Sequence, residues 1–99
     1  MAVGIEYTTV SKIITANPCS LLAVLIGGGS VSSEADLYDG MDASSGRKIA
    51  HFSNMAYMTT TAEFYAAQIS RGLYLAVTTA AGGFTVIWDV PGPMATPGV

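Results

Sequence analysis

The stretch GFTVIWD, residues 83–89, is the part of the chain that decides the fold. Successive side chains of a β-strand point to opposite faces, so Phe84, Val86 and Trp88 would share one face of an extended strand. The opposite face carries a threonine and ends in Asp89. This period of two predicts a strand with one face in a hydrophobic core and a more polar face outside.

The same alternation recurs in LYLAV, residues 73–77, and in EADLY, residues 34–38. In the second of these, Ala35 and Leu37 are expected to point inward while two carboxylates face water. Residues 20–26, SLLAVLI, differ because both faces of the stretch are apolar. We interpret it either as a central strand covered on each side, or as a strand with one face in the core and one in a subunit contact.

Further strands are expected at residues 8–16, 48–53 and 59–67. An alternative for residues 61–68 is a helix, since the segment is rich in alanine and has a glutamate near its start, but the preceding run of threonines favours a strand. Turn signals such as Asp39-Gly40 and Gly82-Gly83 separate the strands.

Together these patterns predict an all-β fold, a single antiparallel β-sandwich of about seven or eight short strands, either jelly-roll or Ig-like. The sandwich is expected to span residues 8–90. Residues 1–7 are expected to form an N-terminal arm. The Pro- and Gly-rich residues 91–99 are expected to form a C-terminal arm, because proline lacks the donor that a central strand needs.

The composition excludes several classes of protein. Of the 99 residues, 51% are hydrophobic and 11% are charged, against about 25% charged in typical soluble domains. This excludes intrinsic disorder. Four basic side chains in a chain of net charge −3 argue against nucleic acid and against an anionic membrane surface as partners. The chain has one cysteine, so it cannot form an internal disulfide or a cysteine zinc site. A small domain without such staples commonly gains stability by oligomerising.

Nothing in the sequence predicts export or a membrane segment. The N-terminus lacks the basic and apolar regions of a secretory signal. The longest apolar run, residues 21–26, is far shorter than the about 20 residues that span a bilayer. We therefore expect the protein to be made in the cytoplasm of its host.

Candidate catalytic and ligand-binding residues are few. His51 is the only histidine and no G-x-S-x-G motif accompanies it, so we interpret it as a strand residue with a local hydrogen bond. The spacing of Asp36, Asp39 and Asp42 does not match an EF-hand, although a loop site for calcium stays open. The GGGS segment at residues 27–30 lacks the lysine of a phosphate loop. The sequence thus predicts no enzyme, no cofactor and no catalytic residue.

Apolar side chains outside the expected core point instead to contacts between proteins. Tyr38 and Tyr74 fall on outer strand faces, and tyrosine suits interfaces because its ring is buried while its hydroxyl keeps a partner. Residues 55–58, MAYM, form an apolar stretch in an expected loop, where methionine fits adaptable recognition surfaces. The predicted assembly interface consists of Ile5, Tyr7, Met55, Tyr57, Met58, Pro91 and Met94.

Several segments also carry a resemblance to a known group of proteins. ADLYDG at residues 35–40, SGRKIA at 45–50, RGLYL at 71–75 and TVIW at 85–88 resemble small β-sandwich virion proteins of tailed bacteriophages. That group comprises capsid cement or decoration proteins and related head-fibre or tail accessory modules. The resemblance spans roughly residues 18–90.

The resemblance implies a structural protein without catalytic activity that self-associates, commonly as a trimer, on the exterior of the capsid. The expected function is to decorate and stabilise a bacteriophage capsid as a cement protein, in contact with the major capsid protein. The alternative is a receptor- or glycan-binding module of a head fibre or tail. Glycan binding that is lost on Tyr57→Ala would favour that alternative.

Overall fold

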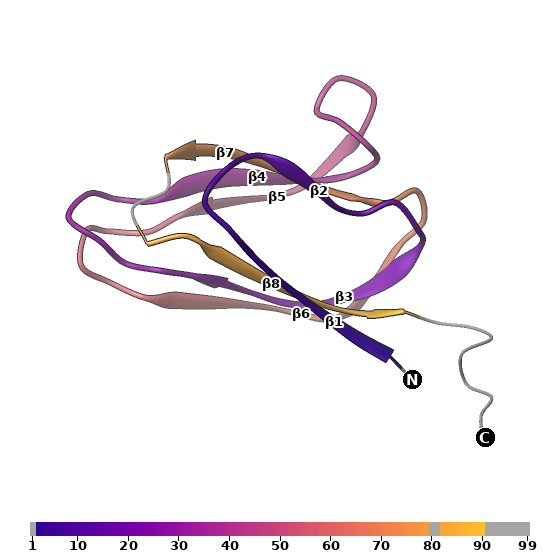
Figure 1. Ribbon diagram of the computed structural model, residues 1–99, viewed down its shortest axis with the longest axis horizontal. Coiled ribbons are helices and arrows are strands. Elements are labelled where there is room, and N and C mark those ends of the chain that lie inside the picture. Colours follow the sequence, from indigo (N-terminus) through magenta and orange to yellow (C-terminus); the bar gives the residue numbers. More distant parts are fainter. Residues whose placement is uncertain (1, 80–81, 91–99) are drawn as a thin grey trace.

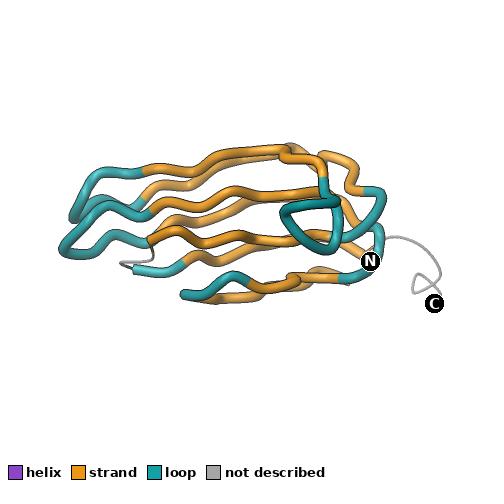
Figure 2. Tube along the Cα trace, turned by 90° about the horizontal axis from the view of Figure 1, so that it is seen from above, coloured by secondary structure: helices purple, strands orange, loops and turns teal. Residues whose placement is uncertain are grey.

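The computed structural model describes residues 2–79 and 82–90 as an all-β structure without a helix. Its strands form two four-stranded antiparallel sheets, β1-β8-β3-β6 and β2-β7-β4-β5, which lie face to face (Figures 1 and 2). The predicted β-sandwich is therefore confirmed. The strands are β1 (Ala2–Thr8), β2 (Lys12–Thr15), β3 (Cys19–Ile26), β4 (Glu34–Asp39), β5 (Arg47–Ser53), β6 (Thr60–Ile69), β7 (Leu73–Thr79) and β8 (Phe84–Val90).

The order of the strands decides between the two expected types of sandwich. β4 and β5 form a hairpin, and the pairs β3–β6, β2–β7 and β1–β8 are nested around it. The chain thus behaves as one long hairpin of four strand pairs that is rolled into two sheets. This is the topology of a jelly roll.

The core lies between the sheets and contains the residues that the alternation predicts. Phe84, Val86 and Trp88 are all buried on the inner face of β8. Ala35 and Leu37 are buried on β4, where they oppose residues of β7. Phe52 and Phe64, from strands of different sheets, meet edge to face with their ring centroids 6.0 Å apart. The other buried hydrophobic residues are Ile14, Cys19, Leu21, Val24, Ile26, Ile69, Leu73 and Leu75.

β3 is a central strand, and a bulge sets which of its apolar residues face the core. It lies between β8 and β6, and its register with both neighbours shifts between Leu21 and Ala23. The extra residue changes the alternation, so Leu21 and Val24 are both buried in the core. Ala23 and Leu25 are left on the opposite face, where they are half-buried.

β6 is a strand, as the threonine run indicated, but it is irregular at its centre. Ala67 opposes Leu21 and Glu63 opposes Ala23, so β6 carries two more residues than β3 over the same interval. Tyr65 and Ala66 lie in this bulge with φ angles of 51° and 62°. Both residues have backbone angles in the left-handed region, which residues other than glycine rarely adopt.

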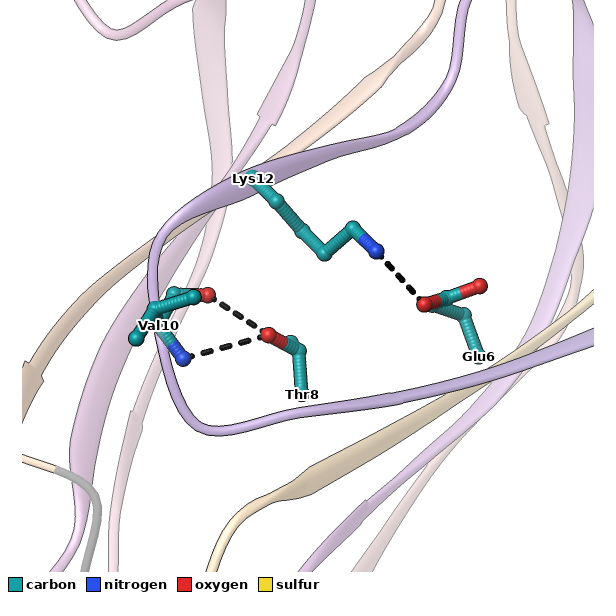
Figure 3. Close-up of polar contacts among 4 residues, drawn as sticks. All are labelled: Glu6, Thr8, Val10 and Lys12. Carbon is teal, nitrogen blue, oxygen red and sulfur yellow. Dashed lines mark hydrogen bonds and ion pairs between the residues drawn. The ribbon is translucent and has the colours of Figure 1, made fainter.

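The expected N-terminal arm is instead a strand of the sandwich. β1 pairs with β8 along its whole length. The prediction of one strand over residues 8–16 was wrong, because the chain turns after Thr8. The Thr8 hydroxyl accepts a bond from the amide of Val10 at 3.1 Å and donates to the carbonyl of Val10 at 2.8 Å (Figure 3). A threonine side chain closes this turn without glycine or proline. The expected C-terminal arm lies outside the described residues.

Candidate functional site

The outward face of the β1-β8-β3-β6 sheet has an apolar side, on β1, and a polar side, on β6. Directly opposed residues of neighbouring strands point to the same face, so the register assigns each residue to a row across the sheet. We call this surface the sheet face. Its rows are Val3–Asp89–Ser20–Gln68, Ile5–Ile87–Ala23–Glu63 and Tyr7–Thr85–Leu25–Thr61.

The exposed large hydrophobic residues of the sheet face lie at its β1 side. The side chain of Ile5 is 66% exposed, and its neighbours Val3 and Tyr7 are also exposed. Towards the centre, Ile87 on β8 is half-buried. Asp89 and Glu63 are the charged members of the sheet face, and one carboxylate oxygen of Asp89 is buried without a partner among the described residues. Exposed apolar surface of this kind marks contacts with other molecules.

The outward face of the other sheet has a different chemistry. Asp36 on β4 accepts a bond from His51 Nδ1 at 2.6 Å and pairs with Lys48 Nζ at 3.6 Å. Beside them, the rings of Tyr38 and Tyr74 lie tilted with centroids 6.4 Å apart. The two faces of the sandwich are therefore unequal: one carries the paired charged groups Asp36, Lys48 and His51, and the other carries the exposed aliphatic residues Val3 and Ile5.

Three loops lie together at one end of the sandwich: residues 27–33, 54–59 and 82–83. We call this surface the loop end. The amide of Tyr57 donates to the carbonyl of Gly29 at 2.7 Å, and the amide of Gly27 donates to the carbonyl of Gly83 at 2.8 Å. The Asn54 side chain accepts a bond from the amide of Ser33 at 2.9 Å. The first two loops lie at the left end in Figure 1, away from the chain termini.

The loop end is apolar and carries no formal charge. Met55 is 72% exposed and Tyr57 is 80% exposed, and Met58 and Val31 are exposed beside them. None of the three loops contains Asp, Glu, Lys, Arg or His. The backbone of Tyr57 is in the left-handed conformation, with a φ of 63°, and its side chain points outward. A surface of this composition suits burial against an apolar partner surface.

The structure divides the predicted interface into two adjoining surfaces. Ile5 and Tyr7 belong to the sheet face, while the residues predicted from MAYM belong to the loop end. The Tyr7 hydroxyl donates to the carbonyl of Gly82 at 3.1 Å and so connects the two. Pro91 and Met94 lie outside the described residues. Sequence reasoning missed Val3, Val31 and Tyr65, which is 87% exposed on the β6 bulge.

Among the described residues, His51 and Asp36 are the part of a catalytic triad that the fold brings together. The hydrogen bonds of the described residues join His51 to Asp36 and to no hydroxyl group. Both residues stand on an open strand face, and no pocket is found on the part of the chain that the structure describes. The local hydrogen bond expected for His51 is thus present.

The three aspartates of the D-x-x-D-x-x-D pattern do not converge on one point. Asp39 is buried, and its carboxylate accepts bonds from the amides of Ser70 and Arg71 at 3.2 Å and 2.9 Å. Burial raises the pKa of Asp39, but these bonds, the Ser70 hydroxyl and the charge of Arg47 outweigh it and lower the pKa. No cluster of metal-ligating side chains occurs within residues 2–79 and 82–90.

Asp42 serves the β4–β5 loop instead. Its Oδ1 accepts bonds from the amide of Ser45 at 2.7 Å and from the hydroxyls of Ser45 and Ser44 at 2.8 Å and 3.0 Å. These bonds lower the pKa of Asp42, and the bond from the Ser45 amide has the largest effect. The carboxylate therefore acts as a local acceptor that shapes its own loop.

Comparison of the chain with protein families, with curated proteins and with solved structures found no match. The described residues include no helix able to cross a membrane.

Proposed function

We propose that the protein is a structural virion protein that decorates and stabilises a bacteriophage capsid from its exterior. In this function it self-associates and contacts the major capsid protein. The observation that supports the proposal most is the pair of adjoining apolar surfaces, the sheet face and the loop end, on one small sandwich. Both are the kind of surface that a stable contact between proteins removes from water.

The two surfaces allow a division of contacts. The sheet face presents the exposed Val3, Ile5 and Tyr7 along β1, which suits contact with a sister copy of the chain. The loop end presents Met55, Tyr57 and Met58 from one loop, which suits insertion between subunits of a shell. Many weak contacts then hold together, because neighbouring copies on one shell raise the effective concentration of each contact.

The resemblance to small phage virion proteins supplies the biological setting of the proposal. Jelly rolls occur in viral capsid and lectin domains, but a fold alone does not assign a function. The resemblance implies self-association, commonly as a trimer, and a place on the capsid exterior. The mass of the purified protein in solution, measured by light scattering, tests the number of copies directly.

Binding to capsids tests the proposal. The double variant Met55→Ser, Tyr57→Ser should cosediment with capsids at least about tenfold more weakly than the unaltered protein, because it removes two interface anchors. Met41→Ser is the matched control, since Met41 is an exposed methionine in the loop between β4 and β5. Deleting residues 91–99 should also weaken attachment. Equal cosedimentation of all these proteins, or absence of the chain from purified virions, would contradict the proposal.

A receptor- or glycan-binding module is the second candidate. Tyr57 favours it, because an exposed aromatic ring at the end of a sandwich is able to stack on a sugar. A glycan array decides between the two: binding that disappears in Tyr57→Ala, with attachment to capsids unchanged, supports the recognition module.

A further inference from the structure

The two sheets of the sandwich have four edge strands, and these differ in how well they are protected from pairing with another chain. In the β1-β8-β3-β6 sheet the edges are β1 and β6, and in the other sheet they are β2 and β5. An edge strand presents unpaired backbone donors and acceptors that are able to pair with another chain. Soluble proteins therefore guard their edges with short strands, charged side chains or bulges.

Three of the four edges carry such guards. β6 is interrupted by the bulge at Tyr65 and Ala66. β2 has four residues, and its register with β7 shifts between Ile13 and Thr15. β5 exposes three charged or titratable side chains, Arg47, Lys48 and His51.

β1 is neither short nor bulged, and its outward face carries no charge. Its seven residues pair with β8 without a register shift. The outward side chains Val3, Ile5 and Tyr7 are apolar and exposed. Its one charged residue, Glu6, lies in the opposite alternation and is held by Lys12 Nζ at 2.6 Å (Figure 3).

We propose that β1 pairs antiparallel with β1 of a second copy of this chain, centred on Ile5, and so joins two four-stranded sheets into one. In this register Ile5 opposes Ile5 of the second copy, Val3 opposes Tyr7 and Gly4 opposes Glu6. Every outward pair is apolar, and apolar cross-strand pairs are the stabilising unit of a sheet.

Other registers lose these contacts. Centring the pair on Glu6 places the two Glu6 carboxylates directly opposite each other, which is destabilising. A shift of one residue places the outward side chains of one copy beside the inward face of the other. The Ile5 register also extends the sheet face of each copy into that of the other, so the apolar surface becomes continuous across the pair.

The contact is isologous, and it therefore generates a twofold axis. This inference rests on the self-association part of the proposed function and assigns it to one strand. It predicts an even number of copies in solution, in contrast to the trimer that the resemblance implies. The contact with the capsid remains the task of the loop end.

Cysteine cross-linking tests the register. Ile5→Cys alone should form a covalent dimer under mild oxidation, because the paired Cα atoms would lie within the about 7 Å that a disulfide needs. Val3→Cys and Tyr7→Cys should each fail alone, since four residues of strand separate equivalent positions by about 14 Å, and should cross-link when mixed. The unaltered chain is the background control, because Cys19 is buried and burial, with a smaller effect of Asp39, raises its pKa to about 11.

A second pair of variants tests the contact without a disulfide. Ile5→Lys places a charge on the exposed side of β1 and should convert the dimer to single subunits in light scattering. Ile13→Lys, on the guarded edge strand β2, is the matched control and should leave the dimer intact.

The outcomes separate this inference from the proposed function. Self-association without the Ile5→Cys cross-link, or a cross-link by Val3→Cys alone, would overturn the β1 contact. Single subunits at every concentration tested would overturn it too. In either case cosedimentation of the same samples with capsids still measures whether the chain binds a shell.

Discussion

The ammonium group of Lys12 and the carboxylate of Glu6 lie 2.6 Å apart and join β2 of one sheet to β1 of the other (Figure 3). Glu6 opposes the buried Val86, and Lys12 opposes the buried Leu75, so both side chains start from the inner side of their strands. The pair closes one lateral side of the sandwich. Because these charges are turned inward and paired, the outward face of β1 is left apolar.

This ion pair is expected to contribute little to stability. Both side chains are more than a third exposed, and ion pairs in such positions typically contribute about 0.2–1 kcal/mol. A double-mutant cycle with Glu6→Gln and Lys12→Met should give a coupling free energy in that range, smaller at high salt because ions screen the charges. A coupling free energy that did not change with salt concentration would show that the pair is far less hydrated than its exposure indicates.

Gly4 is expected to be required by the indole ring of Trp88. The two residues oppose each other in β1 and β8, and a Cβ on Gly4 would overlap the ring. Gly4→Ala should lower the free energy of unfolding by about 1–3 kcal/mol, because overpacking forces the ring to move. Trp88 is the only tryptophan, so its emission should shift to the red in this variant. Ile13→Ala, at an exposed position of the edge strand β2, should change neither measurement appreciably.

Asp39 is expected to stabilise the end of the sandwich that contains the β6–β7 turn. Asp39→Asn replaces one acceptor oxygen with an amide nitrogen. This donor would face the donor groups of Ser70 or Arg71, so their hydrogen bonds to that atom would be lost. The loss should be about 1–3 kcal/mol in urea unfolding, the usual effect of leaving buried polar groups unpaired. Asp42→Asn is the control. Its bonds go to Oδ1 alone, which asparagine retains, so its midpoint should stay close to that of the unaltered protein.

The contribution of Asp39 to the stability of the fold should also depend on pH, and it should fall as the solution becomes acidic. Its pKa in the folded protein is lowered, so the ionised carboxylate stabilises the fold at pH values above the unfolded pKa of about 3.9. This stabilisation is lost as the pH falls through the lower pKa of the folded state. The difference in Tm between the unaltered protein and Asp39→Asn should therefore be constant near neutral pH and shrink below about pH 4. A difference that grew on acidification would contradict the assigned bonds.

The alternation of apolar residues was sufficient to predict the core strands. Phe84, Val86 and Trp88 are buried because a period of two in a strand allows only one face to meet the core. A different argument, the placing of MAYM in a loop between strands, pointed to Met55 and Tyr57 as surface residues, and both are exposed. Local patterns of this kind are read directly from neighbouring residues.

The features that sequence reasoning missed depend on partners distant in the chain. Asp39 was expected in a turn, but it is buried because its bonding partners follow 31 and 32 residues later. The bulge in β3 changes which of its apolar residues face the core, and it is set by pairing with β6 and β8. The turn after Thr8 was missed because a threonine hydroxyl supplies it without glycine or proline.

The bulge of β6 gives a prediction in which two neighbouring alanines respond in opposite directions. Ala66 has a φ of 62°, and a residue with a Cβ is strained in this region by about 1–2 kcal/mol. Ala66→Gly should therefore raise the free energy of unfolding by up to about 1 kcal/mol, the strain relief being partly offset by the greater entropy of glycine in the unfolded chain.

Ala67 follows the bulge, pairs regularly with Leu21 and packs against the core. Ala67→Gly should lower the free energy of unfolding by at least about 0.5–1 kcal/mol, because glycine weakens a strand interior. Chemical denaturation of the two variants measures both effects. Opposite signs at adjacent positions identify backbone strain at Tyr65 and Ala66 as the cause, whereas destabilisation by both variants would show that the bulge stores none.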